Sequence, residues 1–201
     1  SFNTRRHNIK FSTGLLNNRF ELAGRLSAIA SDGYIDRATS DLKSYFLQAS
    51  YLDETTLVKA ITFGGAEVTY QSWNGIDKET LEQDRTFNSA GMFTDELGNV
   101  QFYDNEVDNY GQDIYQLIWN QRINSNWNTN VSLNYTRGLG YFEQYKEDQK
   151  LLKYGMENIE LGGEQITKTD LVRRRWLDNH FYVLNANATY KKEDLNLTFG
   201  T

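Results

Sequence analysis

The chain has 201 residues, contains no proline and no cysteine, and carries a formal net charge of −6. Without cysteine there is no disulfide, thiolate metal site or cysteine nucleophile, and the acidic balance disfavours sequence-independent nucleic-acid binding, which needs a positive surface. Aromatic residues make up 14% of the chain and 13 of them are tyrosines, a residue typical of half-buried strands and membrane interfaces.

Segments that alternate apolar and polar side chains recur along the chain, and this period of two predicts β-strands. In chain order the segments are about Arg5–Leu15, 20–28, 44–51, Thr56–Thr69, Tyr110–Ile123, Trp127–Thr136, 182–190 and 195–199. The mean hydropathy of −0.67 is compatible with membrane strands, because only every second residue of a barrel strand faces lipid. The expected fold class is all-β, an antiparallel meander of about eight strands.

The clearest segment, Trp127–Thr136, separates its side chains into two faces. About ten residues at roughly 3.3 Å each are enough to cross a tilted apolar band about 25 Å tall. We therefore expect one face of the sheet to meet lipid, with Trp127, Val131, Leu133, Leu184 and Leu197. We expect the other face to line a water-filled lumen, with Asn130, Asn134, Asn185 and Asn187.

The connections between these segments alternate in length. Tight turns are expected at Asn17-Asn18, Asp53-Glu54, Asn124–Asn126 and Lys191–Asp194. Between them lie longer links at about Ser31–Ser40, Tyr70–Asn109 and Gly138–Asp170. Short turns on one rim and long loops on the other are typical of an outer-membrane barrel, and long loops are usually functional.

The candidate ligand-binding residues lie in the long links or at the strand end beside them, and they are Tyr70, Trp73, Tyr103, Arg173 and Arg175. Guanidinium groups at a barrel mouth can hold an anionic ligand, but the favoured interpretation of the run Arg173–Arg175 is a strand end whose arginines pair with loop acids. The aromatic residues near the loop bases fit either a ligand vestibule or the interfacial girdle of a membrane barrel.

Other motifs carry no chemistry that we can assign. Asp104–Asp108 offers oxygen ligands but lacks the glycine and terminal glutamate of a calcium loop, so we expect no metal site. His7 and His180 are the only histidines, and no Ser–His–Asp arrangement has local support. We expect neither an enzyme nor a cofactor.

Several stretches, taken together in their order and spacing, resemble the TonB-dependent outer-membrane receptors, especially those of the Bacteroidetes type. These stretches are 31–37, 40–44, Thr69–Gly75, Tyr103–Tyr110, Gly138–Lys146 and Asp170–Asn179. The resemblance implies that residues 1–201 are a partial β-barrel domain within a larger, 22-stranded transmembrane β-barrel. It implies a plug domain and a TonB box outside this chain, and we expect both ends of the chain to be cuts in a longer protein.

The resemblance also implies a function: active uptake of a large scarce nutrient across the cell outer membrane of a Gram-negative-type bacterium, with a ferric siderophore complex as the expected ligand. The implied partners are the inner-membrane TonB complex, the nutrient ligand and outer-membrane lipid, with no nucleic acid. Two alternatives stay open. One is a passive porin, and the other is a soluble β-rich adhesin or carbohydrate-binding module whose apolar strand faces pack against a second sheet.

Overall fold

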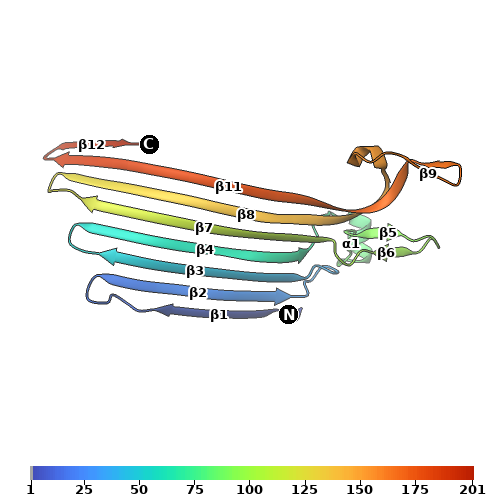
Figure 1. The fold of residues 1–201 in the computed structure, drawn as a ribbon. Coiled ribbons are helices and arrows are strands. Elements are labelled where there is room, and N and C mark those ends of the chain that lie inside the picture. The colour runs from blue at the N-terminus through green and yellow to red at the C-terminus, as the bar shows by residue number, and fades with distance from the viewer. Residues whose placement is uncertain (1) are drawn as a thin grey trace.

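The computed structural model describes residues 2–201. Eight strands form one antiparallel sheet in which neighbours along the chain are also neighbours in space (Figure 1). The strands are β1 (Arg5–Ser12), β2 (Phe20–Ser31), β3 (Ser40–Leu52), β4 (Thr56–Tyr70), β7 (Val107–Arg122), β8 (Trp127–Lys150), β11 (Lys168–Lys192) and β12 (Leu195–Gly200). The predicted all-β meander of about eight strands is confirmed.

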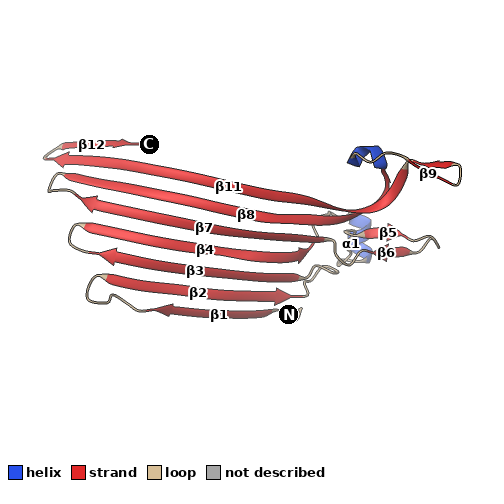
Figure 2. Cartoon of the chain, viewed as in Figure 1, coloured by secondary structure: helices blue, strands red, loops and turns tan. Residues whose placement is uncertain are grey.

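The remaining elements are small and lie in two connections at the same end of the strands (Figure 2). The first connection holds the helix α1 (Lys78–Gln83) and the hairpin of β5 (Met92–Thr94) and β6 (Val100–Phe102). The second holds a 3-10 turn (Leu151–Tyr154) and the hairpin of β9 (Ile159–Leu161) and β10 (Glu164–Ile166). Within residues 2–201, no helix is both long and apolar enough to span a membrane.

The predicted alternation of short turns and long links is confirmed. The four tight turns lie together at one end of the strands, and the long links lie together at the opposite end (Figure 1). Asn17 and Asn18 both have positive φ, 48° and 56°, as the two central residues of a type I′ β-turn require, and the Arg19 N–H closes this turn on the Leu16 carbonyl at 2.9 Å.

The predicted link Gly138–Asp170 is wrong in its bounds. β8 continues to Lys150 and pairs there with Lys168 of β11, so the connection itself comprises residues 151–167. Beyond residue 138 both faces of these strands carry polar and aromatic side chains, and the apolar–polar contrast that identifies a strand is lost. The backbone ladder nevertheless continues, because it depends on main-chain groups and not on the side-chain pattern.

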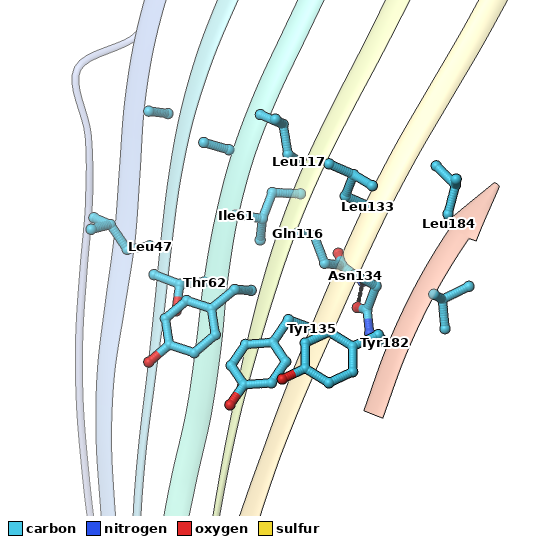
Figure 3. Close-up of a pocket in the computed structure, with 14 residues that line it drawn as sticks. Leu47, Ile61, Thr62, Gln116, Leu117, Leu133, Asn134, Tyr135, Tyr182 and Leu184 are labelled. Carbon is cyan, nitrogen blue, oxygen red and sulfur yellow. Dashed lines mark hydrogen bonds between the residues drawn. The ribbon is translucent and has the colours of Figure 1, made fainter. Parts of the chain in front are cut away.

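One face of the sheet, which we call the apolar face, carries rows of hydrophobic side chains across the strands. Register pairing places one such row over six strands, composed of Leu22, Ala49, Ala60, Leu117, Leu133 and Leu184. Figure 3 shows part of this face, where leucines and tyrosines border an open apolar hollow.

Aromatic rings lie at both ends of the apolar rows. Nearer the tight turns, the rings of Trp127 and Tyr190 lie 5.1 Å apart. Nearer the long connections, Tyr135 stacks between Tyr115 at 5.9 Å and Tyr182 at 4.8 Å. Two aromatic rows that border an apolar band are the arrangement found where a barrel wall meets the two membrane interfaces.

The opposite face, which we call the polar face, carries amides and hydroxyls that bond across the strands. Asn130 donates to Asn120, and Gln116 donates to Asn134 at 3.0 Å. The predicted separation of apolar from asparagine-bearing positions is therefore confirmed for every residue named above. These amides bond to one another within the same face, so they need no partner from a second sheet.

The sheet is a single layer with two free edges. β1 and β12 do not pair with one another among residues 2–201, so the sheet does not close on itself in this part of the chain. The buried hydrophobic residues Tyr70, Ala90, Val107 and Leu151 all lie where the long connections meet the strand ends, so within residues 2–201 no second layer covers either face of the sheet. A soluble sandwich would need such a layer.

We expect Leu133→Arg to prevent stable membrane folding of the full-length protein while Asn134→Arg is tolerated. Leu133 belongs to the apolar face and is 47% exposed, and a charge at the bilayer midplane costs roughly 2–4 kcal/mol. Urea titration of both variants in lipid vesicles measures the difference. Equal midpoints would show that the apolar face does not meet lipid.

Candidate ligand-binding rim

The best-packed part of the molecule is the rim, where residues 71–106 fold back against the ends of β4, β7 and β8. Four buried polar or charged side chains gather here, namely Gln71, Asn88, Glu106 and Glu143. Each of them must find a partner, because an unpaired polar group in such a position costs about 1–3 kcal/mol. The hydrogen bonds at this rim therefore define how the connection is held.

Tyr70, the last residue of β4, anchors this connection. Its side chain is 6% exposed, and its hydroxyl lies 2.8 Å from the carbonyl oxygen of Tyr103 and 3.1 Å from that of Ala90. Burial raises the pKa of Tyr70. The Arg37 guanidinium lies 3.6 Å above the Phe102 ring and closes the same cluster. The Tyr70 hydroxyl is thus committed to the backbone of the loop.

Glu143 of β8 is the second anchor. Its carboxylate accepts hydrogen bonds from the Tyr103 hydroxyl and the Asn105 amide, each at 2.6 Å, and from the Arg174 guanidinium. Glu143 lies eight residues beyond Tyr135 in β8, roughly 26 Å further along the strand and outside the apolar band. Burial raises the pKa of Glu143, but the three hydrogen bonds outweigh burial and leave this pKa below its ordinary value. Burial and the Glu143 carboxylate raise the pKa of Tyr103 to about 12.

Glu106 is held differently. Its carboxylate accepts the backbone N–H of Tyr145 at 2.8 Å, and burial raises its pKa. The carboxylate therefore points into the rim and ties the loop to β8.

The arginine run is divided between the two faces, because successive residues of a strand point to opposite sides. Arg174 lies on the side of the apolar face and pairs with Glu143. Arg173 and Arg175 lie on the side of the polar face. The expected pairing of an arginine with an acid is found for Arg174, with the difference that the acid belongs to a strand and not to a loop.

Three of the five predicted ligand-binding residues come together on the polar face. Trp73 packs edge-on against Phe142 with ring centroids 5.9 Å apart, and the Arg175 guanidinium lies 5.8 Å from the same ring. Arg173 donates to the side-chain oxygen of Gln144 at 2.7 Å. Trp73 is 57% exposed. We call Trp73, Phe142, Arg173 and Arg175 the rim site.

The other two predicted residues, Tyr70 and Tyr103, lie in the anchor of the loop and not beside the rim site. Sequence reasoning did not identify Gln71 and Gln144, since uncharged amides in a loop and a strand carry no sequence signal. Alternation along the strands places four side chains on one face, namely those of Phe142, Gln144, Arg173 and Arg175. This follows from the sequence only when β8 and β11 are known to extend this far.

The rim site combines two positive charges with two aromatic rings. Guanidinium groups form charge-assisted, often bidentate hydrogen bonds with anionic oxygens, and an exposed indole next to a phenyl ring offers a flat apolar surface. A ligand that fits these features has several anionic oxygens and planar rings.

We expect Glu143→Gln to loosen the loop of residues 71–106. Charged hydrogen bonds contribute about 1.5–3 kcal/mol each, and the half-exposed Arg174 places its own share at the low end. Limited trypsin digestion of the folded full-length protein should therefore cut after Lys78 and Arg85 about tenfold faster than in the wild type.

Glu147→Gln is the matched control, because Glu147 is exposed and accepts only the Thr94 N–H from the same loop. The lowered pKa of Glu143 means that its contribution is present above its ordinary pKa of 4.5 and lost as the pH falls through the lower, folded value. The raised pKa of Glu106 acts in the opposite sense, since its cost at neutral pH disappears below that raised value. Unchanged digestion of Glu143→Gln at neutral pH would contradict the anchoring role.

No protein-family model matches the sequence, and no curated protein matches it. Among solved structures, the chain is similar to the ferric-catecholate import receptor Fiu from E. coli K12 in its open form. The TM-score is 0.56 at 10% sequence identity.

The match covers 96% of this chain and 30% of the receptor chain. The chain therefore spans about a third of the length of the protein it matches, and a likeness at this identity concerns the fold. The eight-stranded antiparallel meander has the fold of part of the barrel of a TonB-dependent receptor.

Proposed function

We propose that this chain forms part of the barrel wall of an outer-membrane receptor that takes up a ferric siderophore complex, or a similar large scarce nutrient, by TonB-dependent active transport. The observation that carries the proposal is the single-layer meander with one apolar face bordered by aromatic rows, together with its likeness to part of a receptor barrel. The protein would move a bound ligand and perform no chemistry on it. Energy would come from the inner-membrane TonB complex through parts outside this chain.

The rim site supports an anionic ligand. In a ferric catecholate or hydroxamate chelate, oxygens bind the metal, and a catecholate chelate also carries net negative charge and planar rings. Arg173 and Arg175 can attract that charge, and Trp73 can contact a ring. We propose these three residues as ligand contacts and Tyr70 and Tyr103 as the anchors that hold the adjoining loop in place.

The two alternatives differ from this proposal in what they require. A porin would share the single-layer wall but would conduct solutes without an energy source, usually through 16–18 strands. A soluble adhesin or carbohydrate-binding module would need a cover for the apolar face, and residues 2–201 place none there.

In cells that produce the full-length receptor, we expect uptake of a radio-iron catecholate chelate to stop when the TonB complex is absent. The double variant Arg173→Gln, Arg175→Gln should raise the half-saturating chelate concentration at least tenfold, because each lost charged hydrogen bond is worth about 1.5–3 kcal/mol. The double variant Lys191→Gln, Lys192→Gln, at the tight-turn end of β11, is the charge-matched control. Uptake that continues without TonB would favour the porin and refute the proposal.

The proposal also implies that the long connections and the tight turns lie on opposite sides of the membrane. Leu97, at the tip of the β5–β6 hairpin, is 87% exposed, whereas Glu193 lies in the tight turn between β11 and β12. A membrane-impermeant maleimide should label Leu97→Cys on intact cells and label Glu193→Cys only after the outer membrane is opened. The reverse pattern would invert the orientation.

A further inference from the structure

We infer that Gln71 is a positioning residue for the rim site: it fixes the side chain of Gln144, which in turn orients Arg173. The inference rests on the proposed function, because it assigns Gln71 a part in binding the anionic ligand. It concerns a residue that touches no ligand itself and whose side chain is 2% exposed.

Every hydrogen-bonding atom of Gln71 is in use. Its side-chain amide donates to the carbonyl oxygens of Val107 at 3.0 Å and Glu143 at 2.8 Å. Its backbone N–H donates to the Glu106 carbonyl at 2.8 Å, and its own carbonyl accepts from Asn88 at 2.9 Å. Gln71 therefore joins the loop to β7 and β8 at one point, with its side chain held in a single orientation.

The remaining atom, Oε1 of Gln71, faces the rim site. It accepts a hydrogen bond from the side-chain amide of Gln144 at 3.3 Å. The oxygen of that same amide accepts from Arg173 at 2.7 Å. The contacts form a chain of three side chains that runs from the buried loop anchor to a guanidinium on the polar face.

This chain determines how Arg173 lies. The Nε atom of Arg173 is shielded from solvent and has no hydrogen-bond partner among residues 2–201. The bond to Gln144 is therefore the side-chain hydrogen bond that sets the orientation of this guanidinium in the described part of the chain. Since Gln71 Oε1 accepts a hydrogen bond from the Gln144 amide nitrogen, Gln71 also determines that the oxygen of Gln144 is turned toward Arg173.

Glutamine meets all of these requirements at position 71, because its side chain carries both an amide donor and an oxygen acceptor. A glutamate would place a carboxylate against two carbonyl oxygens, and a methionine would offer neither donor nor acceptor to its neighbours. An arginine that is held in place before the ligand arrives loses less rotamer freedom on binding. Releasing Arg173 should therefore weaken binding of an anionic ligand by up to about tenfold.

The test uses the purified full-length receptor and a ferric tris-catecholate chelate as the probe, with Kd measured by tryptophan fluorescence quenching. The variants are Gln71→Ala, Gln144→Ala, Arg173→Gln and the double variant Gln144→Ala, Arg173→Gln. Gln144→Ala is the main test, because it breaks the chain without emptying the buried position of Gln71. Gln116→Ala is the matched control, since Gln116 lies on the polar face and bonds to Asn134 far from the rim.

We expect Gln71→Ala and Gln144→Ala each to raise Kd up to about tenfold, and the control to leave it unchanged. The double variant should bind no more weakly than Arg173→Gln alone, because the glutamine acts through the arginine. A purely structural role for Gln144 would instead give additive losses. Heat-dependent electrophoretic mobility confirms that each variant is folded.

Wild-type binding by Gln144→Ala, or additive losses in the double variant, would overturn the inference. Wild-type binding by Arg173→Gln would overturn it as well, because the chain would then end on an arginine that the ligand does not use. None of these results would affect the proposed TonB-dependent uptake, although wild-type binding by Arg173→Gln would also remove Arg173 from the proposed ligand contacts.

Discussion

The constraint on which the rest of this structure depends is the strict alternation of side chains along strands in a single-layer sheet. Each strand bonds to its neighbours through the backbone, so every residue belongs to one face or the other. No second layer exists in residues 2–201 to absorb an exception. The same alternation that collects leucines on one face collects amides on the other, and at the rim it separates Arg174 from Arg173 and Arg175.

At the rim the constraint changes, because residues 71–106 cover the ends of β4, β7 and β8 and create the only substantial buried region of the described chain. Its interior is mostly polar. Glu143 bonds to Tyr103, Asn105 and Arg174, while Gln71 bonds to three stretches of chain. A buried polar cluster is stable only when its members are paired, so the loop is held in one geometry. The adjoining surface, which carries Trp73, is therefore also held in place.

The two long connections differ in this respect. The connection of residues 151–167 has one buried anchor, Leu151 at 2% exposure, and its β9–β10 hairpin is exposed throughout. The connection of residues 71–106 is held from several directions and lies next to the rim site. Both connections extend beyond the strand ends, as Figure 1 shows for β5, β6 and β9, but the connection of residues 71–106 is held by more buried contacts.

The sequence by itself determined the strands, their faces and the alternation of turns and long links, because a period of two and turn residues such as Asn17-Asn18 are local properties. It also supplied Trp73, Arg173 and Arg175 as candidates.

The tertiary structure decided which of these residues meet. Strand alternation turned Arg174 away toward Glu143, and the fold of the loop buried Tyr70 and engaged Tyr103. It also decided that β8 and β11 continue past residue 138, and that Gln71 and Gln144 reach Arg173. These contacts join residues that are 29 and 73 positions apart in the chain, and no local pattern records a partner at that distance, because pairing depends on the register of the whole sheet.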